Sequence, residues 1–170
     1  MARKVFFTTA CRLDTPTSLH FGPQHRRVEG QELRGLNELY LGHPSHQSAR
    51  YQLTTAMGQS ERQSSSGVLV GTGTGATGWC RSVALERRSE MVPPAPTQAG
   101  LCWYAREAWP SPATGTSHTE GTIGPGQAIA ITAESDLVAF ADGIETDALH
   151  LSWGQRVVFS VAPGCLRLLR

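Results

Sequence analysis

Hydrophobic and polar residues alternate in short runs along much of the chain, which is the pattern of half-buried β-strands. In the segment 49–57, Tyr51 and Leu53 fall on one face of a predicted strand. Residues 68–70 are continuously apolar, which favours a strand buried on both faces. Further strands are expected at 4–9 (as an edge strand), 36–41, 101–106, 127–132, 137–141, 148–151, 156–161 and 166–169. The pattern therefore predicts a mainly β fold of about nine strands.

Turn signals and one short helix separate these strands. Asp142-Gly143 is a strong hairpin signal because both residues tolerate the positive φ angles that tight hairpin turns require. Residues 79–88 predict the helix, and the three prolines within 91–100 predict a loop. A long loop at 107–120 is interpreted either as a lid or interface segment, or as a surface loop whose Trp109 is anchored in the core.

The N-terminal part is less well specified than the rest. Residues 11–34 contain no strong element, so residues 1–35 are expected to form a poorly specified arm and residues 36–170 a single domain. The length of 170 residues suits one domain with an appended arm.

Composition excludes several function classes. The net charge of +1 provides no general field for nucleic acid or anionic lipid, and no apolar run approaches the roughly 18 residues that a membrane span needs. His43 and His46 lack a third ligand at metal-site spacing, so no metal site is expected. The four cysteines are far apart and are expected to be buried free thiols. Because the start of the chain also lacks the pattern of a signal peptide, a cytoplasmic location is expected.

The most informative segment is residues 71–78, here called the Gly/Thr loop, which joins the apolar strand to the predicted helix. Its glycines would let backbone N–H groups approach a ligand, and its threonine hydroxyls would add donors. The segment formally matches Gly-x-Gly-x-x-Gly. However, a proline-rich loop follows where a dinucleotide-binding βαβ unit requires a parallel strand, and no Lys closes a phosphate-binding loop. A turn required only for tight packing remains an alternative.

The Asn37-Glu38 pair, followed about thirty residues later by residues 66–79, resembles the NAD kinase family. Asp142-Gly143 and the strands around it resemble the final hairpins of that family, so the resemblance spans roughly residues 36–170. It implies the β-sandwich-like C-terminal domain of these kinases, which phosphorylate NAD to NADP with ATP. The catalytic Gly-Gly-Asp-Gly motif of the family belongs to its N-terminal domain, and that motif does not occur in this sequence.

The resemblance also implies a binding site. Asn37 and Glu38 would bind NAD, and Thr77, Gly78 and Trp79 would contact its adenine and ribose. Thr72, Thr74, Gly75 and Ser82 complete the candidate cofactor-binding residues. Two departures from the family pattern occur: Trp79 replaces a tyrosine, and Ser66 replaces an aspartate that reaches the ligand of a neighbouring subunit.

These residues carry no phosphoryl-transfer machinery, which would need positioned phosphates, a divalent metal and a group that orients the attacking hydroxyl. We therefore expect binding of NAD or NADP without catalytic residues. ATP and Mg²⁺ would enter only if a catalytic domain completed the site, either from the rest of a longer enzyme of which this chain is a fragment or from a partner chain. The alternative is a non-catalytic interaction or assembly module that retains the fold without the ligand site. Self-association is compatible with either interpretation.

Overall fold

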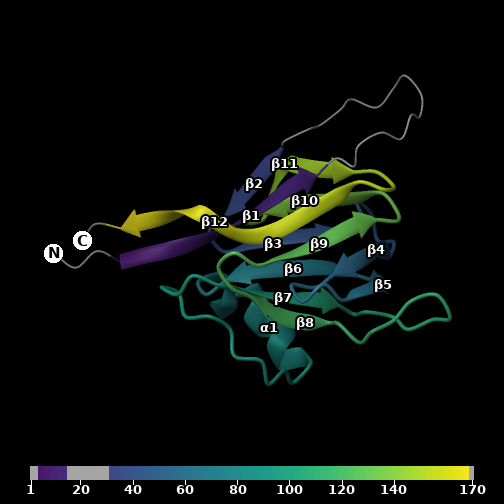
Figure 1. Ribbon diagram of the computed structural model, residues 1–170, viewed down its shortest axis with the longest axis horizontal. Coiled ribbons are helices and arrows are strands. Elements are labelled where there is room, and N and C mark those ends of the chain that lie inside the picture. The colour runs from purple at the N-terminus through teal and green to yellow at the C-terminus, as the bar shows by residue number, and fades with distance from the viewer. Residues whose placement is uncertain (1–3, 15–30, 169–170) are drawn as a thin grey trace.

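The computed structural model describes residues 4–14 and 31–168, and these residues form twelve strands and one α-helix (Figure 1). The strands are β1 (Lys4–Asp14), β2 (Glu32–Gly35), β3 (Glu38–Gly42), β4 (Ala49–Thr54), β5 (Ser60–Ser65), β6 (Gly67–Thr72), β7 (Leu101–Arg106), β8 (Glu120–Ile123), β9 (Ala128–Ala133), β10 (Leu137–Ala141), β11 (Ile144–Leu151) and β12 (Arg156–Leu168). A single 3₁₀ turn, η1 (Gly75–Thr77), precedes the helix α1 (Trp79–Glu86).

The strands form two antiparallel sheets of six strands each, which pack on a shared core. The first sheet has the order β2-β1-β12-β9-β4-β5 and the second has the order β11-β10-β3-β6-β7-β8. One cluster of buried side chains draws on both sheets, for example Leu53 and Phe159 from the first and Leu41 and Trp103 from the second. The prediction of a mainly β, sandwich-like fold is therefore confirmed.

The helix covers part of the outer face of the second sheet (Figure 1). Its Cys80 and Val83 pack with Leu69, Cys102 and Tyr104 in a second, smaller cluster. This explains why β6 is buried at all six positions, as its continuous apolar run predicted: one face points into the sandwich and the other lies under α1. The prediction of a single short helix is confirmed, and it ends two residues earlier than expected.

The N-terminal strands differ from the prediction. The strand expected at residues 4–9 extends to Asp14, and it is not at the edge, because it pairs with β12 on one side and with β2 on the other. β2 forms the edge in its place, within a segment that the pattern left without an element. β12 is one long strand where two were expected.

Strand β5 was missed because its sequence, Ser-Glu-Arg-Gln-Ser-Ser, shows no hydrophobic alternation. Its inward-facing Gln63 and Ser65 are buried and polar, and both form hydrogen bonds with the hydroxyl of Tyr51, at 3.1 and 2.7 Å. Buried polar groups are tolerated when they are hydrogen-bonded, so these pairs let a polar strand line the core.

The long loop after β7 runs along β5, the edge strand of the first sheet. Trp109 and Gly115 donate backbone hydrogen bonds to β5 carbonyl groups, and the carboxylate of Glu61 accepts from the backbone N–H groups of Ser117 and His118. Trp109 itself is 70% exposed, so the interpretation that it anchors the loop in the core is wrong. The loop is held by backbone hydrogen bonds and by polar side chains of β5, and it covers a strand edge that would otherwise be open to pairing.

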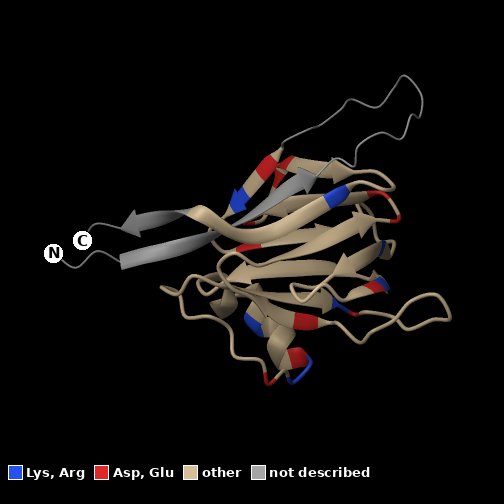
Figure 2. Cartoon of the chain, in the orientation of Figure 1, with Lys and Arg blue, Asp and Glu red and all other residues tan. Residues whose placement is uncertain are grey.

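Charged side chains are dispersed over the described part of the molecule. Figure 2 shows acidic and basic residues interspersed at the strand ends and around the C-terminal end of α1. Within residues 4–14 and 31–168, no helix has the length and apolarity needed to cross a bilayer.

Candidate functional site

The structure brings the Asn37-Glu38 segment and the Gly/Thr loop together at the ends of β3 and β6. The backbone N–H of Thr72 donates to the carbonyl of Asn37 at 2.8 Å, and the Thr72 hydroxyl donates to the carbonyl of Leu36 at 2.7 Å. The same hydroxyl accepts from the backbone N–H groups of Thr74 and Gly75, both at 3.1 Å. Thr72 is 1% exposed, so it holds the loop against the β3 end and does not present its hydroxyl at the surface.

Gly75 makes this close approach possible. A Cβ atom at Gly75 would overlap the carbonyl group of Asn37, which is backbone and cannot rotate away. The requirement for glycine here is therefore steric, because the loop passes directly over the peptide group that precedes Glu38.

Asp142 holds the Asn37-Glu38 segment from the other side. Its carboxylate accepts from three successive backbone N–H groups, those of Leu36, Asn37 and Glu38, at 2.8, 2.7 and 3.1 Å. Its own N–H donates to the carbonyl of Glu38 at 2.9 Å. Asp142 and Gly143 have φ values of 50° and 73°, so the predicted hairpin turn is confirmed. Sequence reasoning recognised this turn but missed its carboxylate as a positioning group.

The carboxyl group of Glu38 lies in this cluster and is partly buried. Burial raises the pKa of Glu38 above its ordinary value of 4.5, and the nearby carboxylate of Asp142 raises it further. The ionised form of Glu38 is therefore less favourable in the folded protein than in the unfolded chain.

We expect this raised pKa to appear as a pH dependence of stability. Because the folded state binds the Glu38 proton more tightly, the contribution of Glu38 to stability is greatest below its ordinary pKa and falls as the pH rises through the raised value. Glu38→Gln should remove this loss, so its free energy of unfolding should exceed that of the wild type more at about pH 7 than at about pH 4. Urea unfolding at a series of pH values tests the difference. An NMR titration that places the Glu38 midpoint at or below 4.5 would contradict it.

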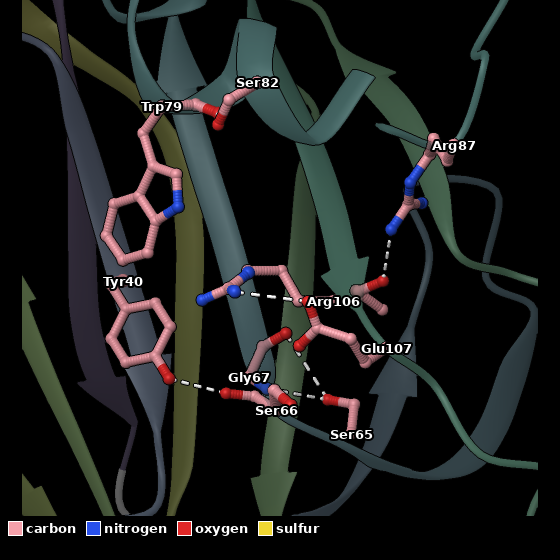
Figure 3. Close-up of polar contacts among 10 residues, drawn as sticks. Tyr40, Ser65, Ser66, Gly67, Trp79, Ser82, Arg87, Arg106 and Glu107 are labelled. Atoms are coloured by element: carbon pink, nitrogen blue, oxygen red, sulfur yellow. Dashed lines mark hydrogen bonds and ion pairs between the residues drawn. The ribbon is translucent and has the colours of Figure 1, made fainter. Parts of the chain in front are cut away.

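The indole of Trp79 already has ring partners (Figure 3). Tyr40 stacks on it with ring centroids 5.2 Å apart and an interplanar angle of 21°, and the guanidinium of Arg106 lies 5.3 Å from the indole centroid. Tyr40 is anchored in turn by its hydroxyl, which donates to the carbonyl of Ser66 at 2.5 Å. A base that stacks on Trp79 therefore has to share the ring with these partners or displace one. No sequence pattern indicated Tyr40 or Arg106.

Thr77, Gly78 and Ser82 are exposed, but much of the hydrogen-bonding capacity of this segment is used internally. The Thr77 hydroxyl donates to the carbonyl of Thr74, and the Ser82 hydroxyl donates to that of Trp79, both at 2.9 Å. The N–H groups of Thr77 and Gly78 also donate within the loop, to Thr74 and Gly75. Together with those of Thr74 and Gly75, four N–H groups are therefore turned inward, contrary to the expectation that they approach a ligand.

Among the candidate residues, the groups that remain outward are neutral or acidic. Asn37 is exposed, Glu38 is partly exposed, and the hydroxyl oxygens of Thr77 and Ser82 retain lone pairs. Thr74 Oγ1 is buried and has no hydrogen-bond partner among the described residues. The outward groups fit the hydroxyls of a ribose and the edge of a base, whereas the inward-turned N–H groups cannot bind a pyrophosphate. Across the described ranges, no group of three or more His, Cys, Asp and Glu residues is placed to hold a metal ion.

No model of a known protein family matches this chain, and no curated protein matches its sequence. The resemblance to NAD kinases therefore depends on the quoted motifs alone.

Proposed function

We propose that this chain binds NAD or NADP through the surface formed by Asn37, Glu38 and the exposed end of the Gly/Thr loop, without phosphorylating it. One observation carries the proposal. Two segments that lie about 35 residues apart, and that the resemblance assigns to one dinucleotide site, are joined by the hydrogen bonds of Thr72 to Leu36 and Asn37.

The chemistry of the exposed groups supports the adenosine and ribose portions as the recognised parts. The amide of Asn37 both donates and accepts, and the carboxylate of Glu38 accepts from hydroxyl groups. Thr77 and Ser82 add hydroxyl oxygens near the start of α1. Because the four inward-turned N–H groups of the loop are not available to phosphate, we expect an affinity in the micromolar to millimolar range.

Phosphoryl transfer is not part of the proposal for the isolated chain. The family's Gly-Gly-Asp-Gly motif does not occur in these 170 residues. ATP and Mg²⁺ would therefore act only together with such a catalytic domain, whether it belongs to a longer form of this protein or to a second chain.

A second candidate function is a non-catalytic assembly module, and the ring contacts of Trp79 favour it. With Tyr40 stacked on the indole and Arg106 over it, the aromatic position of the candidate site is already engaged within the chain. In this alternative the domain binds a second copy of itself or a partner chain, and it no longer binds the ligand.

NMR titration with NAD separates the two candidates through the indole N–H signals of the four tryptophans. We expect a saturable shift of one indole signal, which Trp79→Phe should remove. The signal of Trp103, which is 3% exposed in the core, reports whether the sample is folded. Asn37→Ala should weaken binding about 5-fold, the value of one or two lost hydrogen bonds.

Gln52→Ala is the matched control for Asn37→Ala, because Gln52 is an exposed amide on β4 of the opposite sheet. Its affinity should equal that of the wild type. Unchanged affinity in both Asn37→Ala and Thr77→Ala would refute the assignment of the site. A folded sample without any shift at millimolar NAD would favour the assembly module.

A further inference from the structure

Two cysteines that are distant in sequence meet beneath the Gly/Thr loop. Cys80 lies on α1 and Cys102 on β7, they are 1% and 0% exposed, and both are free thiols. Both belong to the small cluster that packs α1 on the outer face of the second sheet.

The positions of the two thiols relative to Gly71 indicate how closely they approach each other. Gly71 on β6 is directly opposite Cys102 in the β6–β7 register, so a side chain at Gly71 would lie beside that of Cys102. The sulfur of Cys80 occupies that place, because a Cβ built at Gly71 would overlap it. The Cys102 thiol in turn lies 3.6 Å from the carbonyl oxygen of Gly71. Both sulfur atoms therefore lie next to Gly71, which has no side chain to separate them.

A cavity leads to one member of this pair. It has a volume of about 430 Å³ and lies between α1, η1 and the loop that follows the helix. Its walls include Cys80, Ala76, Ala84, Pro93 and Tyr104. A molecule the size of hydrogen peroxide is much smaller than this volume, so it can reach the cavity wall to which Cys80 contributes without unfolding of the sandwich.

We propose that Cys80 and Cys102 form a peroxide-reactive dithiol that closes to an intramolecular disulfide. The Cys80 sulfur attacks one oxygen of hydrogen peroxide, the O–O bond breaks, and Cys80 sulfenic acid and one water form. The Cys102 sulfur then attacks the sulfenic sulfur, the S–O bond breaks, and the disulfide and a second water form. Two thiols are oxidised and one peroxide is reduced.

The contact between the two thiols suits Cys102 to the second attack and disfavours Cys80 in the first. A hydrogen bond from the Cys80 thiol lowers the pKa of Cys102, although burial opposes this effect, and the same contact together with burial raises the pKa of Cys80. Cys102 is therefore the thiol that ionises more readily, and it makes the second attack. The raised pKa of Cys80 makes the first step slow, so the reaction requires peroxide well above trace levels.

The disulfide would tie α1 to β7 and thereby fix the helix that begins at the end of the Gly/Thr loop. A cross-link that closes a loop of this length constrains the unfolded chain, so oxidation should raise the melting temperature by about 5 °C.

The test uses the full chain with Cys11→Ser and Cys165→Ser, which leaves only the proposed pair. After treatment with hydrogen peroxide, mass spectrometry should find the loss of two hydrogens, a peptide linked through Cys80 and Cys102, and no thiol that reacts after unfolding. A further Cys102→Ala change should abolish the linked peptide and leave Cys80 as the sulfinic acid. If the variant lacking Cys11 and Cys165 fails to fold, peptide mapping of the oxidised wild type gives the same answer.

Two results would overturn the proposal. One is that both thiols stay reduced in the folded protein after prolonged treatment at peroxide levels well above those that oxidise free glutathione in the same tube. The other is that the disulfides that form join different chains or involve Cys11 or Cys165. The readout is thiol chemistry, so its outcome does not depend on whether the chain binds a dinucleotide.

Discussion

Replacing Gly75 with alanine is expected to lower the free energy of unfolding by about 3 to 4 kcal/mol, as the sum of overpacking and lost hydrogen bonds. The added methyl group would overlap the carbonyl group of Asn37. That carbonyl cannot retreat easily, because it accepts from Thr72 and because Asp142 holds the N–H groups on both sides of it. Relief of the overlap therefore requires the Gly/Thr loop to lift away from β3. Dinucleotide binding, if it occurs at this surface, should be lost with it.

Gly124→Ala is the matched control for this change. Gly124 follows β8, and the only atoms near a Cβ there belong to the side-chain amide of Gln127, which can shift at the cost of at most its one hydrogen bond from the Gly124 N–H. Its cost should stay within about 1 kcal/mol. Urea unfolding of both variants gives the comparison. An equal loss in the two variants would show that the approach of Gly75 to Asn37 is not what makes the loop sensitive.

Asp142→Ala is expected to cost about 3 kcal/mol, because three backbone N–H groups lose one charged acceptor and hydrogen bonds to charged groups are among the stronger ones. The positive φ of Asp142 adds strain for alanine. The lost hydrogen bonds all belong to the segment that contains Asn37 and Glu38, so this variant should also disorder the candidate site.

Asp142→Asn separates the effect of the negative charge on stability from the effect of the backbone conformation. Asparagine tolerates the positive φ and retains one acceptor oxygen, so it should lose about half as much stability as alanine. Urea unfolding gives the two losses, and the amide proton shifts of Leu36, Asn37 and Glu38 report the hydrogen bonds directly. If the amide shifts of these residues are unchanged in Asp142→Ala, the carboxylate does not have the role that we assign to it.

Much of the fold was predictable because positions that are buried in the core are mostly occupied by apolar residues, and these recur with the period of the element. The apolar run at 68–70 became the centre of a strand buried on both faces, and Asp142-Gly143 became the expected hairpin. Prediction failed at β5, where the inward positions are polar and are satisfied by Tyr51. It also failed at the short strands β2 and β8, which bury only two residues and one residue, respectively.

The candidate site was predictable as a set of segments but not as a set of roles. Motif spacing brought Asn37, Glu38 and the Gly/Thr loop into one hypothesis, and the structure places these segments in contact. The inward orientation of Thr72 and of the loop N–H groups depends on where β3 ends relative to β6. That position follows from strand pairing between distant residues and leaves no trace in local sequence.

By itself, the sequence determined the mainly β architecture, the single helix and the segment in which a ligand would be sought. These features follow from local propensity and from the burial period of each element. Only the tertiary structure decided that Asp142 holds Asn37 and Glu38, that Tyr40 and Arg106 engage Trp79, and that Cys80 meets Cys102 at Gly71. Each of these contacts joins segments that are distant in sequence: two turns, two strands, or a strand and the helix. Such contacts depend on sheet register and on the docking of α1. Both of these are determined by the packing of the whole core and not by any one segment.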